Sequence, residues 1–282
     1  MVNKWQFEAI GTHWSIETER PINEHVRTII TNRIEEFDKT YSRFREDSLV
    51  SEVAGKAGEY DFPTDASKLI GLYKKLYDAT DGAVSPLVGN ALVEAGYDKD
   101  YSLQPGTVHV VPKWDEIMRW QGTRVTTTQP ATLDFGAAGK GYLVDIVGEL
   151  LERNEHEMYV IDASGDIQTR GDSEVIGLEN PHDPEQVIGV MKVENASLCA
   201  SAVNRRVWGK WHHVIDPRTG RPVSEVVATW VSAPTTMEAD GLATALFFAS
   251  SDVLSDWSFQ YVRLLGDGRI EHSPNFVGEL YL

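Results

Sequence analysis

The chain has 282 residues, of which 41% are hydrophobic and 24% are charged, and its formal net charge at pH 7 is −17. These values are ordinary for a globular protein that is long enough to bury its own core. The negative charge disfavours contact with nucleic acid phosphates and anionic lipid heads, so we expect no nucleic acid partner and no membrane partner. The single cysteine, Cys199, excludes an internal disulfide and an all-cysteine metal site.

The amino-terminal sequence runs directly into an alternating segment. It has no apolar stretch of signal-peptide length and no cysteine that could carry a lipid. No run of about 18 apolar residues occurs elsewhere, so no membrane-spanning helix is expected. We therefore expect a cytoplasmic protein, although a chain whose leader has been removed would show the same pattern.

The first predicted elements are a strand pair and two helices. Residues 5–18 alternate around a break at Gly11-Thr12, which predicts two strands or one bent strand. Apolar residues then recur every three or four positions from Val26 to Phe44, which predicts a long amphipathic helix. A second helix carries the apolar residues of 69–77 and ends at Asp81-Gly82.

The middle of the chain, residues 83–131, has no clear period, and only a short helix is expected there, near Trp114–Trp120. A strand is expected at Thr132–Phe135, and a glycine-rich turn then leads into a helix at Leu143–Leu151.

The second half of the chain mixes strands with one further helix at Ala239–Ser250. Short apolar or alternating runs predict strands at 159–161, 187–193, 207–215 and 226–232. The tail 257–282 is typical of a hairpin that turns at Gly266-Asp267-Gly268. Helices and strands mix without a regular βαβ rhythm or a repeat, so we predict an α+β fold and a single domain over 1–282.

The glycine-rich stretch Asp134–Tyr142 joins a predicted strand to a predicted helix. Backbone amides and the helix dipole attract an anion at such a junction, and Lys140 adds a positive charge. Only two residues separate Gly136 from Gly139-Lys140, and Gly141 follows, so the stretch is not a P-loop. Val144 occupies the position where a dinucleotide fingerprint needs a small residue. A packed turn with a solvated lysine fits the spacing equally well.

Asp240 and Thr244 lie four residues apart in a predicted helix, and therefore on one face of it. A carboxylate and a hydroxyl at this spacing suit a hard cation that keeps water or phosphate ligands. In the alternative interpretation, Asp240 complements the helix dipole and the Thr244 hydroxyl bonds back to its own helix.

His212 and His213 precede a tight turn that opens with Asp216-Pro217 and closes at Gly220. Alternation along a strand sends the two side chains to opposite faces. One of them could carry a proton or contact a ligand, and the alternative is an ordinary surface histidine.

Seven segments in the same order across nearly the whole chain resemble the ApbE-type FAD:protein FMN transferases. They are Gly11-Thr12, Tyr41–Phe44 with Asp47-Ser48, Thr80–Ala83, Asp134–Tyr142 with Asp145, Ala163–Ile167, His213–Pro222 and Ala239–Ala245. The resemblance implies an α+β, T-fold-like arrangement of mixed sheets and helices around a two-part FAD cleft. It also implies a Mg²⁺-dependent or Mn²⁺-dependent reaction that cleaves FAD, releases AMP and leaves FMN on a Thr or Ser of a client flavoprotein.

The resemblance also implies roles for individual residues. Asp240 and Thr244 match the family's metal-binding acid and hydroxyl, and Ala137 matches its backbone-carbonyl ligand. His213 matches a histidine proposed to move the proton, and either His213 or Asp240 is a candidate base. The positions that match FAD contacts are Ile10, Phe44, Gly82, Ala83, Val84, Asp134 and Lys140.

The chain departs from the family pattern at several places. Ser164-Gly165 stands where two glycines are usual, and Val84-Ser85-Pro86 replaces a bulkier stretch that contains an acid. Cys199–Ala202 lacks an expected Ser-Gly pair. The resemblance also implies that many family members are exported lipoproteins, whereas we expect no leader in this sequence.

Three other functions compete with the transferase. An FAD pyrophosphatase would use the same metal site and release free FMN. A flavin-binding protein would hold FAD unchanged when Mg²⁺ is added. An acidic interaction scaffold would need none of these motifs.

Overall fold

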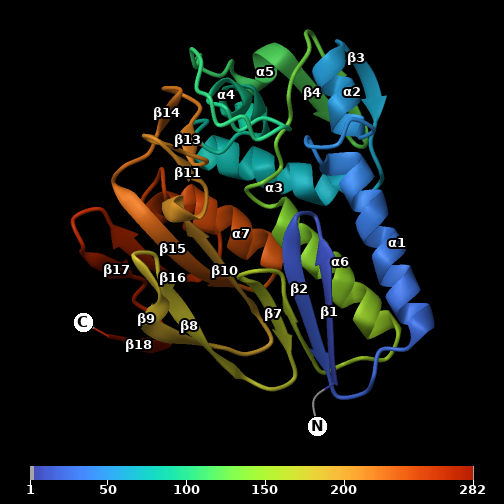
Figure 1. Ribbon diagram of the computed structural model, residues 1–282, viewed down its shortest axis with the longest axis vertical. Helices are drawn as coiled ribbons and strands as arrows, with labels where there is room; N and C mark the ends of the chain where they lie inside the picture. The colour runs from blue at the N-terminus through green and yellow to red at the C-terminus, as the bar shows by residue number, and fades with distance from the viewer. Residues whose placement is uncertain (1–2, 282) are drawn as a thin grey trace.

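A computed structural model describes residues 3–281, and a single eight-stranded sheet runs through its centre (Figure 1). Every neighbouring pair in this sheet is antiparallel. In order across the sheet, the strands are β1 (Asn3–Ala9), β2 (Thr12–Thr18), β6 (Tyr159–Asp162), β7 (Asp166–Arg170), β10 (Ser197–Ala202), β15 (Val226–Ala233), β16 (Gln260–Leu265) and β17 (Ile270–His272).

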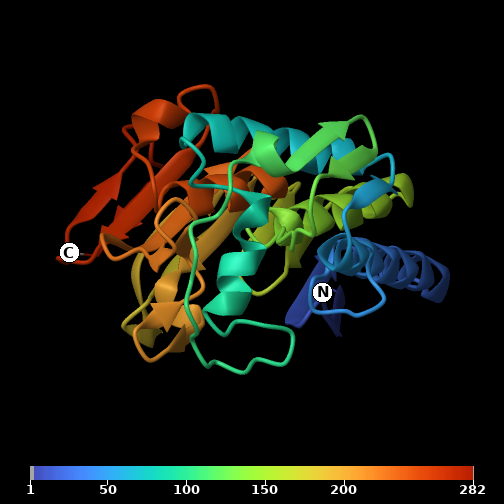
Figure 2. The same cartoon turned by 90° about the horizontal axis from the view of Figure 1, so that it is seen from above.

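Two layers of helix lie over one face of the sheet. The inner layer is α6 (Gly139–Arg153) and α7 (Thr236–Ala245), which contact each other and strands β7, β10 and β15. The outer layer is α1 (Glu24–Tyr41), which packs on α6, and α3 (Ala66–Ala79), which packs on α7. Figure 2 shows these layers from above, with α3 lying over α7 and α6.

Smaller elements surround this frame. One three-stranded sheet contains β3 (Gly58–Asp61), β5 (Arg124–Thr127) and β4 (Met118–Gln121), and another contains β18 (Gly278–Leu280), β9 (Asp183–Val193) and β8 (Glu174–Asn180). The short helices are α2 (Leu49–Gly55), η1 (Pro86–Val88), α4 (Gly89–Glu94), α5 (Trp114–Ile117), η2 (Val203–Arg205) and η3 (Ser251–Leu254). The two-residue strands are β11 (Val207–Trp208), β12 (Trp211–His212), β13 (Ile215–Asp216) and β14 (Arg221–Pro222). No helix within residues 3–281 is long and apolar enough to cross a membrane.

The predicted α+β class is confirmed, and so are the elements with a strong sequence period. The strand pair of 5–18 is β1 and β2, which turn at Ile10 and Gly11, both with positive φ. The apolar positions of α1 from Val26 to Tyr41 are buried. The second helix ends where expected, since Asp81 and Gly82 adopt positive φ. The predicted tail hairpin is β16 paired with β17.

Two predicted strands were wrong. Thr132–Phe135 is not in a sheet, because the Asp134 amide donates to the carbonyl of Pro86 and the Thr132 amide donates to Asn90. The run 207–215 is not one strand, because Gly209 at φ +58° turns the chain so that β11 pairs with β12. The next strand, β13, pairs with β14 instead.

Several helix boundaries also differ from the prediction. The first helix ends at Tyr41, so Phe44 lies beyond it. The last helix runs from Thr236 to Ala245 rather than over 239–250, because the Thr235 side chain accepts the Glu238 amide and sets an earlier start. The middle region, 83–131, also contains α4, β4 and β5, and the helix at Trp114 gives way to β4 at Met118.

The buried carboxylate of Asp145 joins the two inner helices. Its Oδ1 accepts the Thr236 amide at 2.8 Å, and its Oδ2 accepts the Met237 amide at 2.9 Å. Gln168 of β7 donates to the same Oδ1 at 3.0 Å. Burial raises the pKa of Asp145, while the two amides act to lower it. This α6 side chain therefore satisfies the amino-terminal amides of α7 and fixes the two helices against β7.

We predict that Asp145→Ala lowers the free energy of unfolding by at least about 2 kcal/mol, because three buried donors lose their acceptor. Urea unfolding measures this change. Asp252→Ala, at an exposed acid in the first turn of η3, is the control and should stay within about 0.5 kcal/mol of the wild type. An Asp145→Ala protein as stable as the control would show that this carboxylate does not hold the helices together.

Candidate active site

The candidate site lies where the amino-terminal end of α6 meets α7. The Gly141 amide donates to Oδ2 of Asp240 at 3.0 Å. A Cβ on Gly141 would lie 2.3 Å from the carbonyl oxygen of Thr236, so only glycine permits this approach of the two helices. Gly241 lies against Ala138 in the same contact, since a Cβ on Gly241 would be 3.6 Å from the Ala138 Cβ. The glycine-rich stretch therefore serves to bring α6 against Asp240.

Three oxygens near this contact have no protein partner. Within residues 3–281, no hydrogen bond reaches the carbonyl of Ala137, the Thr244 hydroxyl or Oδ1 of Asp240. The alternative interpretation of these two residues is therefore not supported. The Thr244 hydroxyl does not bond back to its own helix, and Asp240 lies in the second turn of α7 and accepts a hydrogen bond from α6. The described chain contains no group of three or more His, Cys, Asp and Glu side chains suited to a metal. A carboxylate, a hydroxyl and a carbonyl nevertheless form an oxygen set that fits a hard cation such as Mg²⁺.

The alternative of a packed turn with a solvated lysine does not hold for Lys140, because its amino group is paired within the protein. Its Nζ lies 2.8 Å from Oδ2 of Asp166 and donates to the carbonyl of Ala163 at 2.8 Å. Burial acts to lower the pKa of Lys140, but the carboxylates of Asp166 and Asp240 outweigh it, and the pKa is raised. The charge of this lysine is therefore largely used within the protein.

Asp166 and Asp240 are two buried acids that share one lysine. Burial raises the pKa of both, and Lys140 acts to lower them. The charge of Asp166 raises the pKa of Asp240 further. With all three groups ionised the cluster carries one excess negative charge, which a bound cation would neutralise.

Asp134 is fully engaged with the protein rather than free for a ligand. Its Oδ2 lies 2.5 Å from Nε of Arg43, and its Oδ1 accepts the Gly136 amide at 2.7 Å. The Arg43 side chain is only 4% exposed, and its Nη1 donates to the carbonyl of Tyr97 at 2.8 Å. Arg43 was not predicted as a site residue, although it belongs to a segment that carries the family resemblance.

The two histidines differ in their surroundings, although His213 lies beyond the end of β12 and strand alternation does not apply to it. In His212, Nε2 lies 2.8 Å from the carbonyl of Val223 and Nδ1 accepts the Val214 amide, so this ring is neutral and structural. In His213 the ring is half-buried, and its buried Nδ1 has no partner. The charge of Arg206 acts on the His213 ring and lowers its pKa further, beyond the effect of burial.

Phe44 lies in a cluster of aromatic rings beside this histidine segment. The Arg43 guanidinium lies over its ring at 4.1 Å from the centroid. Tyr101 stacks on Phe44 with the ring centroids 5.4 Å apart and the planes 13° from parallel. Tyr101 is 55% exposed, and sequence patterns did not single it out, because it belongs to an irregular loop.

The remaining predicted contacts lie on two turns. Ile10 forms the tip of the β1–β2 hairpin, which lies next to the β6–β7 turn because the Ser164 hydroxyl donates to the carbonyl of His13. Gly82 is partly exposed, whereas the side chains of Ala83 and Val84 are buried, so these two can offer a ligand only backbone groups.

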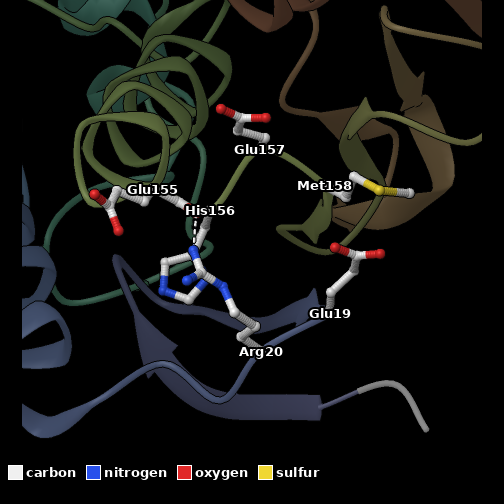
Figure 3. Close-up of a pocket in the computed structure, with 6 residues that line it drawn as sticks. All are labelled: Glu19, Arg20, Glu155, His156, Glu157 and Met158. Atoms are coloured by element: carbon white, nitrogen blue, oxygen red, sulfur yellow. Dashed lines mark hydrogen bonds between the residues drawn. The ribbon is translucent and has the colours of Figure 1, made fainter.

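Two surface pockets lie away from these residues. One of about 380 Å³ is lined by Glu19, Arg20 and residues 155–158, and Figure 3 shows Arg20 reaching the backbone of Glu155 there. The other, of about 400 Å³, lies between α3 and β4. No predicted site residue lines either pocket.

We predict that His213 makes the protein less stable as the pH falls. Burial lowers the pKa of His213 to about 3, and the charge of Arg206 adds to this effect. Because the ordinary value is about 6.5, the unfolded chain takes up the proton more readily between these limits, and the folded state loses stability as pH falls through this window. In urea unfolding between pH 7.5 and 4, His213→Gln should lose stability less steeply than the wild type. Equal slopes would contradict a neutral, buried His213.

Comparison with known proteins identifies relatives of this chain. The sequence profile of the ApbE family matches residues 10–260. The chain is 23% identical to the FAD:protein FMN transferase of Buchnera aphidicola over 269 residues, covering 86% of this chain and 78% of the relative. It is 29% identical to the FAD:protein FMN transferase of Haemophilus influenzae over 242 residues, covering 76% and 67%.

Solved structures show the same fold. The ApbE protein of Thermotoga maritima superposes with a TM-score of 0.83 at 23% identity, over 97% of both chains. The flavin transferase ApbE of Vibrio cholerae superposes with a TM-score of 0.81 at 20% identity, over 98% of this chain and 97% of that one. The profile match spans most of the sequence and the fold is the same along nearly its whole length, and this chain is therefore a member of the ApbE family.

Proposed function

We propose that this protein is a Mg²⁺-dependent FAD:protein FMN transferase, acting as one unit over 1–282. The observation that carries the proposal is the set of three unpartnered oxygens, from Ala137, Asp240 and Thr244, beside two buried acids that share one lysine. Membership of the ApbE family and relatives that bear this activity in their names support it.

In this proposal, Ala137, Asp240 and Thr244 hold the cation, and Mn²⁺ could take the place of Mg²⁺ at the same oxygens. When bound, the cation neutralises charge on the pyrophosphate oxygens and makes the attacked phosphorus more electrophilic. Lys140 and Asp166 have a structural role, because their ion pair connects α6 to the β6–β7 turn beside the site.

The proposed reaction is a substitution at the phosphorus of the FMN half of FAD. The hydroxyl oxygen of a client Thr or Ser forms the new bond to that phosphorus, and the bond from phosphorus to the oxygen of AMP breaks. AMP leaves with the bonding electron pair. The His213 ring takes the hydroxyl proton, because its lowered pKa keeps it neutral at neutral pH and its Nδ1 has no partner among the described residues.

A Mg²⁺-dependent FAD pyrophosphatase is the second candidate, because water could replace the client hydroxyl at the same site. A protein that binds FAD without cleaving it is the third. It would not need the unpartnered oxygen set.

The transferase is tested by incubating the protein with FAD and Mg²⁺, with and without a client peptide of the Asp-Gly-Ala-Thr type. We expect AMP release together with a gain of one FMN mass on the peptide threonine, measured by chromatography and mass spectrometry. AMP with free FMN and an unmodified peptide would favour the hydrolase. Bound, intact FAD and no AMP would leave only a flavin-binding protein.

We predict that Asp240→Asn lowers FAD cleavage by about 10²-fold or more, because the amide keeps an acceptor for the Gly141 amide but loses the charge that holds the cation. Initial rates of AMP release measure the loss. Glu238→Gln removes an acid from the first turn of the same helix and should keep wild-type rates. Equal rates in the two variants would remove Asp240 from the metal site.

A further inference from the structure

Buried polar atoms without partners mark places where a ligand could complete the protein. Four side-chain atoms of the described residues meet this condition: Trp14 Nε1, Arg43 Nη2, Asp166 Oδ2 and His213 Nδ1. The Asp166 atom is compensated by the charge of Lys140, 2.8 Å away. The His213 atom has a role in the proposed reaction. The Arg43 atom has no role so far, and it belongs to a charged group.

The other donors of Arg43 are already in use. Nε pairs with Asp134 and Nη1 with the carbonyl of Tyr97, while the whole side chain is 4% exposed. Nη2 is thus a cationic N–H donor that can reach neither protein acceptor nor bulk water. Leaving such a donor unpaired is unfavourable, so a ligand that brings an acceptor to Nη2 gains affinity there.

The surroundings of Nη2 favour a flat, neutral acceptor. The guanidinium lies over the rings of Phe44 and Tyr97, 4.1 Å and 4.9 Å from their centroids, which places it at an aromatic stacking surface. The Asp134 carboxylate already neutralises the guanidinium and would repel a phosphate brought to the same place. A ring carbonyl oxygen adds no charge and can lie at the edge of a stacked ring.

We propose that Nη2 of Arg43 donates a hydrogen bond to a carbonyl oxygen of the flavin ring, so that Arg43 selects the flavin half of FAD. This inference rests on the proposed function, since it takes FAD as the ligand. The Arg43–Asp134 pair then has two roles. It holds the turn before α6, and in this proposal its arginine also binds the edge of the flavin ring.

Arg43→Lys tests the inference, because lysine keeps the charge beside Asp134 and removes the Nη2 donor. Calorimetry without Mg²⁺ gives the Kd for FAD and for ADP, which lacks the flavin. We expect FAD to bind about tenfold more weakly to the variant, and ADP to bind equally to both proteins. Arg33→Lys is the matched control, since Arg33 pairs with Asp65 at the opposite end of α3 from Thr80, and both affinities should be unchanged.

Ligand analogues test the same bond without changing the protein. Sulfur is a weak acceptor, so either 2-thio-FAD or 4-thio-FAD should bind the wild type about tenfold more weakly than FAD does. That penalty should disappear in Arg43→Lys.

Each other outcome overturns the inference. Equal losses for FAD and ADP would make Arg43 structural. Unchanged FAD binding together with normal binding of both thio analogues would mean that Nη2 makes no bond to the flavin. A wild-type protein that binds ADP but not FAD would overturn the proposed function itself, which these outcomes otherwise leave intact.

Discussion

The approach of α6 to α7 at Gly141 is the constraint on which the rest of the site depends. With a side chain at this position the Thr236 carbonyl would have to move, and the Asp240 carboxylate could not accept the Gly141 amide. Asp145 lies about one helical turn further along α6, and its two carboxylate oxygens accept the first two amides of α7. Glycine therefore permits the contact and aspartate fixes it, and Asp240 is held against the amino-terminal end of α6 as a result.

The charges of the site are mostly balanced inside the protein. Lys140 pairs with Asp166, and Arg43 pairs with Asp134, so neither cation is free to attract a phosphate on its own. In a chain of net charge −17, a cation brought from solution then strengthens the binding of an anionic substrate. The excess negative charge of the Lys140–Asp166–Asp240 cluster gives that cation a place to bind. The acidic composition and a phosphate-bearing substrate are compatible for this reason.

Sequence patterns predicted the parts of this fold that have a local cause. The period of α1, the positive-φ turns at Gly11 and Gly82 and the α+β class all follow from neighbouring residues. The kink at Gly209 was missed, because a glycine in an alternating run gives no sign of which φ it adopts. The partners of Asp134 and Asp240 were missed as well, since they lie 91 and 99 residues away in the chain and no local pattern joins them. The candidate residues came from resemblance, and their roles stay predictions.

The stacking of Tyr101 on Phe44 has a consequence for the speed of binding. Two rings whose centroids are 5.4 Å apart leave no room for a third ring between them, since each layer of a stack takes up roughly 3.5 Å. Any flat ligand that uses that face of Phe44 has to wait until Tyr101 swings away. Its association rate would then level off at high ligand concentration, at a ceiling set by the loop rather than by diffusion.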